Sequence, residues 1–180
     1  WYVDAEGAET VCAEHLVLAA PARALAPVCN TFDEELGCEL GAVHYGSSAI
    51  VTFAYKREQV MHPLDAYGFV VPTSETLLTR AASFSSVKWP HRAPPGYVLM
   101  RAFVGGSYSE GVAARPESEL LGPVHQELSL LLGIRGAPLW HRTDRYVECM
   151  PRYHLGHREL VGRIEARAAT RHAVTNAAAT

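Results

Sequence analysis

Histidine and cysteine side chains near the C-terminal end form the densest group of residues that could bind a metal. The chain has nine histidines, and His141, Cys149, His154 and His157 lie close together in its sequence. A zinc site needs three or four such ligands that converge tetrahedrally. His154 and His157 flank Gly156 in a predicted turn before a helix, so surface or helix-capping roles are the favoured interpretation. We predict no metal site.

The serine and glycine residues supply no complete catalytic motif. Ser85, Ser86 and Ser107 are not part of a G-x-S-x-G nucleophile elbow, and no motif links them to a histidine base. Gly105 and Gly106 lack the spacing of a G-x-G-x-x-G fingerprint or of a phosphate-binding loop. The sequence therefore predicts no catalytic residue.

Three arginines and a set of apolar side chains are the remaining candidates for ligand binding. Arg80, Arg92 and Arg101 could pair with ligand carboxylates, although solvation at the surface is the commoner fate of arginine. Six large residues in predicted strands are either ordinary core, which is the commoner outcome, or the floor of a flat apolar pocket for a macrocyclic ligand. They are Val51, Phe53, Tyr67, Phe69, Phe84 and Met100.

The composition is that of an ordinary globular domain. The chain has 180 residues, of which 48% are hydrophobic and 19% charged, enough for one sizeable core. A formal net charge of -3 without blocks of either sign gives no reason to expect nucleic acid as a partner. The four cysteines show no C-x-x-C spacing, and the sequence shows no signal peptide. Both observations favour reduced thiols in a cytoplasmic protein.

The apolar periodicity of the sequence predicts strands and helices around these residues. A continuous apolar run at 15–20 is typical of a strand buried on both faces. Thr31 and Glu34 have the spacing of a capping box, and Gly133 follows an apolar helical period as a C-cap would. Strands are predicted at 15–20, 48–55, 67–71, 79–86, 97–104 and 139–149 after a hairpin over 1–12, and helices at 21–25, 31–40, 120–132 and 157–169.

Five stretches of sequence carry a resemblance to a known family. They are HLVLAAPARA (15–24), SSAIVTFAYKRE (47–58), HPLDAYGFVVPTSE (62–75), FSSVKWPHRAPPGYVLMRAFVGG (84–106) and MPRYHLGHRELVGRIE (150–165). In this order the stretches resemble the oxygen-dependent protoporphyrinogen oxidases of the flavin-containing amine oxidase superfamily. The similarity covers roughly residues 10–167.

The resemblance implies an α+β (mixed α/β) fold, with a mixed, largely antiparallel sheet and flanking helices. This is the substrate domain of an FAD oxidase of the p-hydroxybenzoate hydroxylase type. By the same resemblance, residues 1–28 are a partial FAD-domain strand and connection, and residues 29–150 are the substrate-binding domain. Residues 151–180 are a helix returning toward the FAD domain and a divergent tail.

The implied function is FAD-dependent oxidation of protoporphyrinogen or coproporphyrinogen to the porphyrin, with oxygen as acceptor, in haem biosynthesis. The implied partners are the porphyrinogen and oxygen, and the implied location is the cytoplasm. Association with the inner face of the cell membrane and a homodimer are left open. So are two other functions: an inactive, truncated tetrapyrrole-binding module, and another flavin amine oxidase that acts on amines or carotenoids.

The resemblance also implies roles for individual residues. Phe84 matches an aromatic residue that packs on the tetrapyrrole, and Val51, Tyr67 and Phe69 are its expected companions in substrate binding. The expected contacts with the cofactor are Ala20, Pro21 and Met100. No catalytic side chain is needed, because the flavin performs the redox step and the pocket supplies orientation.

The sequence departs from the family pattern at both ends. It contains no G-x-G-x-x-G fingerprint, the motif whose helix N-terminus binds the pyrophosphate. The Gly/Asn-rich flavin motif that closes the family is also absent after residue 167. Since the chain begins at Trp1 within a β-rich stretch, we expect it to be a piece of a longer protein. FAD binding and activity are expected of the full-length enzyme rather than of this chain alone.

Overall fold

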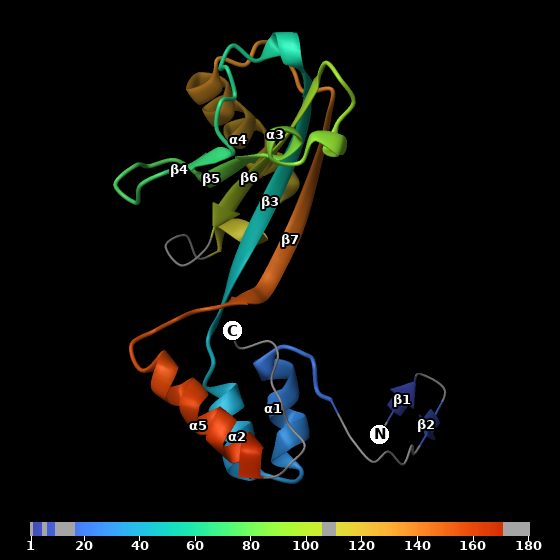
Figure 1. Ribbon diagram of the computed structural model, residues 1–180, viewed down its shortest axis with the longest axis vertical. Helices are drawn as coiled ribbons and strands as arrows, with labels where there is room; N and C mark the ends of the chain where they lie inside the picture. The colour runs from blue at the N-terminus through green and yellow to red at the C-terminus, as the bar shows by residue number, and fades with distance from the viewer. Residues whose placement is uncertain (1, 5–6, 10–16, 106–110, 171–180) are drawn as a thin grey trace. The chain divides into compact units, whose positions relative to one another are not determined.

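The chain divides into two compact units in a computed structural model, and each is described by itself (Figure 1). Unit 1 comprises residues 1–44 and 151–180, and unit 2 comprises residues 45–150. The structure describes residues 2–4, 7–9, 17–105 and 111–170.

Unit 2 is built on a five-stranded antiparallel sheet whose strands have the order β4-β5-β6-β3-β7. The strands are β3 (Tyr45–Lys56), β4 (Gly68–Val70), β5 (Thr79–Phe84), β6 (Tyr97–Gly105) and β7 (Trp140–Pro151). The short helices are η1 (Arg57–Gln59), α3 (Ser85–Lys88), η2 (Pro90–Arg92) and η3 (Val112–Ala114), and the long helix is α4 (Glu117–Leu132). The central strands are rich in Val, Ile, Phe and Tyr, which fit a pleated, half-buried surface.

One face of this sheet forms the hydrophobic core with helix α4, which Figure 1 shows behind the strands. Side chains alternate between the two faces of a strand, so β3 and β6 each send every second residue into the core. On β3 these residues are Ala49, Val51, Phe53 and Tyr55, and on β6 they are Val98, Met100, Ala102 and Val104. Helix α4 meets them with Leu120, Val124, Leu128 and Leu132.

Helix α4 keeps its helical course from end to end although Pro123 lies inside it. A proline lacks the N–H that would donate to the carbonyl four residues earlier. Pro123 lies in the second turn, close to the N-terminal end, where the first N–H groups of any helix have no such partner. The helix stops at Gly133, whose φ of 61° is the left-handed conformation that glycine adopts readily. The C-cap predicted at Gly133 is thereby confirmed.

Glu127 of helix α4 fixes the position at which strand β5 begins. Its carboxylate accepts hydrogen bonds from the backbone N–H groups of Leu78 and Thr79, at 2.7 and 2.9 Å. The pairing of β5 with β6 shifts register between Thr79 and Ala81, and such an irregularity leaves backbone donors without ladder partners. The carboxylate therefore supplies the acceptors that the strand cannot.

A polar pair lies at the edge of the core of unit 2, where buried Tyr55 meets partly buried His125. The hydroxyl of Tyr55 lies 3.0 Å from Nδ1 of His125, and the two rings are stacked. Burial lowers the pKa of His125 below its ordinary value of 6.5, more than the backbone hydrogen bond to Gly136 raises it. Burial also raises the pKa of Tyr55. The lowered pKa favours the neutral imidazole, which accepts from the tyrosine hydroxyl in the tautomer whose Nδ1 carries no proton.

The described residues of unit 1 form three helices and a two-stranded hairpin. The helices are α1 (Ala22–Asn30), α2 (Glu34–Gly41) and α5 (His157–Thr170), and the strands are β1 (Tyr2–Asp4) and β2 (Gly7–Glu9). The carboxylate of Asp33 caps α2 by accepting from the N–H of Leu36 at 3.1 Å. The same carboxylate accepts from Nε of Arg167 at 2.8 Å, which links α2 to α5. This buried acid therefore holds both helices.

Most predicted elements are confirmed, and so is the mixed fold class with its largely antiparallel sheet. Two local predictions are wrong. Thr31 does not cap the second helix, because α1 extends to Asn30 and leaves Thr31 at its C-terminal end, so Asp33 becomes the cap. Residues 17–20 are not a strand, and Val17 is 77% exposed. No described strand pairs with that segment, and residues 10–16 and 171–180 lie outside the described residues.

Replacing Glu127 should loosen the junction between α4 and β5. We expect Glu127→Ala to lower the free energy of unfolding by about 1–3 kcal/mol, because two backbone donors lose their acceptor. The exposed neighbour Gln126 offers a matched control, and Gln126→Ala should change stability far less. Chemical denaturation of both variants measures the difference, and equal midpoints would contradict the bracing role of the carboxylate.

Acid should destabilise unit 2 through His125. Its pKa is lower in the folded state than in the unfolded chain, so the unfolded chain binds the proton more readily. The contribution is present above about pH 6.5 and is lost as the pH falls through the lowered folded-state pKa. Urea midpoints from pH 7.5 to 5 should fall for the native chain and change less for His125→Gln. A His91→Gln control, at an exposed position, should keep the native dependence.

Candidate functional site

The second face of the sheet in unit 2 is the candidate site. Strand register places two rows of side chains on this face, each running across β3, β6, β5 and β4. One row is Ile50, Phe103, Ala81 and Val70, and the other is Thr52, Arg101, Ser83 and Gly68. Exposure along the first row rises from 6% at Ile50 to 79% at Val70. The face therefore opens toward strand β4.

Small side chains keep the part of this face on β5 and β4 flat. Ala81 and Ser83 of β5 stand between larger neighbours, and Gly68 adds no side chain at all. Gly68 has a φ of 152°, and a Cβ at this position would collide with the carbonyl oxygen of Ala82. The close approach of β4 to β5 therefore requires glycine at position 68. A flat ring system could lie on such a surface.

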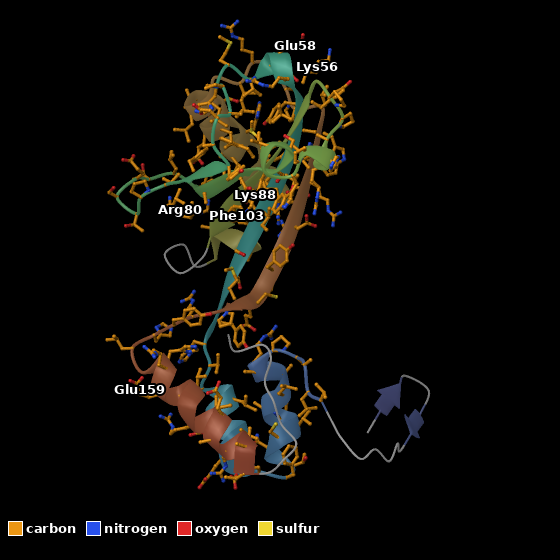
Figure 2. The ribbon with its side chains drawn as sticks, in the orientation of Figure 1. Lys56, Glu58, Arg80, Lys88, Phe103 and Glu159 are labelled. Carbon is orange, nitrogen blue, oxygen red and sulfur yellow. The ribbon has the colours of Figure 1, made fainter. Side chains whose placement is uncertain are left out.

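Phe103 and Arg101 are the largest side chains in the middle of the face. They are two residues apart on β6 and point to the same side, with the guanidinium carbon of Arg101 5.5 Å from the centroid of the Phe103 ring. Figure 2 labels Phe103 together with Arg80, which lies on the neighbouring strand β5. Arg80 donates to the backbone carbonyl of Glu75. The face thus combines an aromatic ring and a cation with apolar surroundings.

The residues predicted to bind substrate lie mainly on the opposite, core-facing side. Val51 and Phe84 are fully buried in the core cluster. Phe69 is partly buried and packs edge-on against Phe84, with 6.2 Å between ring centroids, whereas Tyr67 is 68% exposed in the segment before β4. The structure thus brings Val51, Phe69 and Phe84 together, but as packing residues. Their contact with a ligand stays a prediction.

The residues predicted to contact the cofactor lie in different units. Ala20 and Pro21 precede helix α1 of unit 1, where the carbonyl of Pro21 accepts from the N–H groups of Ala24 and Leu25. Met100 lies in unit 2 and is completely buried in its core. A role for Met100 at a flavin stays a prediction that this burial does not support.

Sequence reasoning missed Val70, Ser83 and Phe103. Val70 and Ser83 are each next to a position that the sequence favoured, and Phe103 is two residues after Arg101. Strand alternation puts neighbouring residues on opposite faces. The available signal was the alternation itself: Phe84 and Met100 pair across β5 and β6, so their neighbours Ser83 and Arg101 had to share the other face. The sequence prediction selected large apolar residues of the strands instead, and most of these face the core.

A separate cavity of about 670 Å³ lies beside the Pro/Arg loop of unit 2. Its lining includes Arg57, Arg92 and Pro90–Val98. Arg57 of η1 donates to the backbone carbonyls of His62 and Pro63, both at 3.1 Å, so its guanidinium fixes the segment that follows η1. Arg92 lies over the ring of Trp89. These contacts give Arg57 and Arg92 a structural role.

The histidines near the C-terminal end do not assemble a metal site in the described part of the chain. No three His, Cys, Asp or Glu side chains are grouped there as metal ligands. His154 stacks edge-on against His44, with ring centroids 5.2 Å apart, and His157 lies against Tyr153. His141 belongs to unit 2 and lies 3.8 Å from a carboxylate oxygen of Glu117.

Comparison with known proteins gives one consistent result. The sequence pattern of the family described as flavin containing amine oxidoreductase matches residues 2–170. Coproporphyrinogen III oxidase of Bacillus subtilis is 28% identical over 152 residues, which are 84% of this chain and 32% of that protein. The Staphylococcus aureus enzyme of the same name is 34% identical over 119 residues, 66% of this chain and 25% of that protein. The chain thus spans a third or less of these relatives.

Solved structures agree on the fold. A protein from Exiguobacterium sp. 255-15, described as a protoporphyrinogen oxidase, superposes with a TM-score of 0.76 at 24% identity, covering 92% of this chain and 36% of that one. Reduced UDP-galactopyranose mutase gives a TM-score of 0.72 at 16% identity, covering 94% and 36%. At such identities the likeness concerns the fold alone.

None of the described helices combines the length and apolar character needed to cross a membrane.

Two phenylalanines on opposite faces of the sheet should respond differently to truncation. Phe84→Ala removes a fully buried ring and should lower the free energy of unfolding by about 3–5 kcal/mol. Phe103→Ala removes a partly exposed ring and should lower it by roughly 1 kcal/mol. Denaturant titration of both variants measures the contrast. Losses of similar size would mean that Phe103 is a core residue, contrary to the assignment of the open face.

Proposed function

This chain belongs to the flavin-containing amine oxidoreductase family, and on that premise we propose that it is the substrate-binding part of an FAD-dependent porphyrinogen oxidase. The reaction converts protoporphyrinogen or coproporphyrinogen to the porphyrin, with oxygen as the final acceptor. The observation that carries the proposal is the similarity to relatives named for these two oxidations, which spans 84% of the chain in one case. The flat open face of the sheet supports it.

The described residues do not form an FAD site by themselves. Pro21 has no N–H, and its carbonyl already accepts from the first turn of α1. No glycine-rich turn stands before that helix to cradle a pyrophosphate. FAD would therefore be held chiefly by residues beyond those described, and the role of unit 2 would be to bind the substrate.

The open face can orient a large, mostly apolar ring. Ligand sites are typically apolar surfaces with a few well-placed polar groups, and the two rows on β3, β6, β5 and β4 fit that description. Phe103 and Val70 supply apolar contact, while Ala81 and Ser83 leave room for the ring to lie flat. In flavoenzymes the cofactor carries the redox chemistry and the protein supplies orientation and exclusion of water. Unit 2 would supply the orientation.

Partners and location follow from the same proposal. Oxygen is the acceptor, the cytoplasmic location stays a prediction, and a homodimer and contact with the inner face of the cell membrane stay open.

A full-length enzyme that combines this chain with an FAD-binding domain, supplied with FAD, should oxidise a porphyrinogen and release hydrogen peroxide. Oxidation of amines or carotenoids in its place would assign the chain to a different substrate class. The 180-residue chain alone should show no turnover.

A charge placed on the open face should disturb tetrapyrrole binding. Val70 is 79% exposed, so Val70→Asp leaves the core intact while it puts a carboxylate where an apolar ring would lie. We expect at least about fivefold weaker binding of a porphyrin, measured by quenching of its fluorescence. Val147→Asp, at an exposed position on β7, is the matched control and should bind as the native chain does. Unchanged binding by Val70→Asp would reject this face as the site.

A further inference from the structure

Arg101 is the charged side chain in the rows that cross the open face. It lies on the middle strand of the five, β6, between Thr52 of β3 and Ser83 of β5. Both neighbours are uncharged and short. Arg101 is partly buried, so water solvates its guanidinium less than it would solvate one at the surface.

Within the described part of the chain, no carboxylate pairs with Arg101 and no backbone carbonyl accepts from it. Other arginines of unit 2 are occupied: Arg142 pairs with Asp144 at 2.6 Å, and Arg145 donates to a backbone carbonyl at 2.8 Å. The contact made by Arg101 is with the Phe103 ring, at 5.5 Å. A cation–π contact engages the face of the guanidinium and leaves its N–H edge available for an anion.

A partly buried guanidinium among uncharged side chains discriminates between ligands. A ligand edge that carries a carboxylate can form two parallel hydrogen bonds with it. An apolar ligand edge would displace the water molecules that solvate the guanidinium and would offer no hydrogen-bond acceptor in their place. Burying the charge in this way is unfavourable. Coproporphyrinogen has a propionate on each of its four pyrrole rings, whereas protoporphyrinogen has two propionates on one side and two vinyl groups on the other. The tetracarboxylate thus meets Arg101 with an acid in any orientation.

We propose that Arg101 binds a substrate carboxylate and selects tetrapyrroles that carry an acid on all four rings over those that carry two. This inference rests on the proposed function, because it assumes that a tetrapyrrole lies on the open face. It names the residue that distinguishes the two porphyrinogens and predicts that coproporphyrinogen is the preferred one. Arg101 acts here as a specificity-determining residue and takes no part in the redox step.

The test uses the 180-residue chain and three stable porphyrins: coproporphyrin III with four carboxylates, mesoporphyrin with two, and coproporphyrin tetramethyl ester with none. Affinities come from fluorescence quenching. The native chain should bind the tetracarboxylate most tightly, and Arg101→Gln should weaken that binding about tenfold, as expected when a charge-assisted hydrogen bond is lost. Binding of the ester should not change, and added salt should weaken only the carboxylate-dependent part.

Two further variants separate charge from structure. Arg101→Lys keeps the charge without the planar fork and should recover part of the preference. Arg142→Gln removes an exposed arginine that is already paired and should bind all three porphyrins as the native chain does. Circular dichroism checks that each variant is folded.

The possible failures are distinguishable. If Arg101→Gln binds the tetracarboxylate as tightly as the native chain, or weakens the ester equally, the role of Arg101 is overturned while tetrapyrrole binding stands. If the native chain binds none of the three porphyrins, the open face is not a tetrapyrrole site, and both the proposed function of this face and the inference built on it fail.

Discussion

The register between strands β3 and β6 is the constraint on which unit 2 depends. Nine consecutive residue pairs, from Ser48 with Gly105 to Lys56 with Tyr97, align these two strands. Because side chains alternate, a slip of β6 by one residue would move all its core-facing side chains to the other face. Met100 would then leave the core, and Arg101 would enter it. The energy of the core and the composition of the open face are therefore set by the same pairing.

Much of the fold was predictable, because strands and helices leave periodic patterns in a sequence. The apolar spacing of α4 and the glycine after it predicted both the helix and its end. The capping residue of α2 was less predictable, since Thr31, Asp33 and their neighbours compete and the length of α1 decides between them. Residues 17–20 belong to an apolar run, but no described strand pairs with them. Local pattern alone cannot supply a pairing partner.

The candidate site was harder to predict than the fold, and the reason is physical. A large apolar residue in a strand suits a core and a ligand floor equally well, and Phe84 has no local mark that distinguishes them. Only packing by Leu120, Val124 and their neighbours on α4 settles which face is covered. The residues left on the other face, such as Ala81 and Ser83, are small and draw no attention in a sequence. The candidate site is the face of the sheet that α4 does not cover.

Strand β7 forms one edge of the sheet, and its twelve residues are mostly exposed. A long edge strand with free backbone groups is a template on which other chains can add strands and aggregate. Here the strand is interrupted by charges at Arg142, Asp144, Arg145 and Glu148, and Glu148 adopts a positive φ of 46° that breaks the regular extended geometry. The opposite edge, β4, is only three residues long. Both borders of the sheet thus resist the growth of intermolecular β-structure.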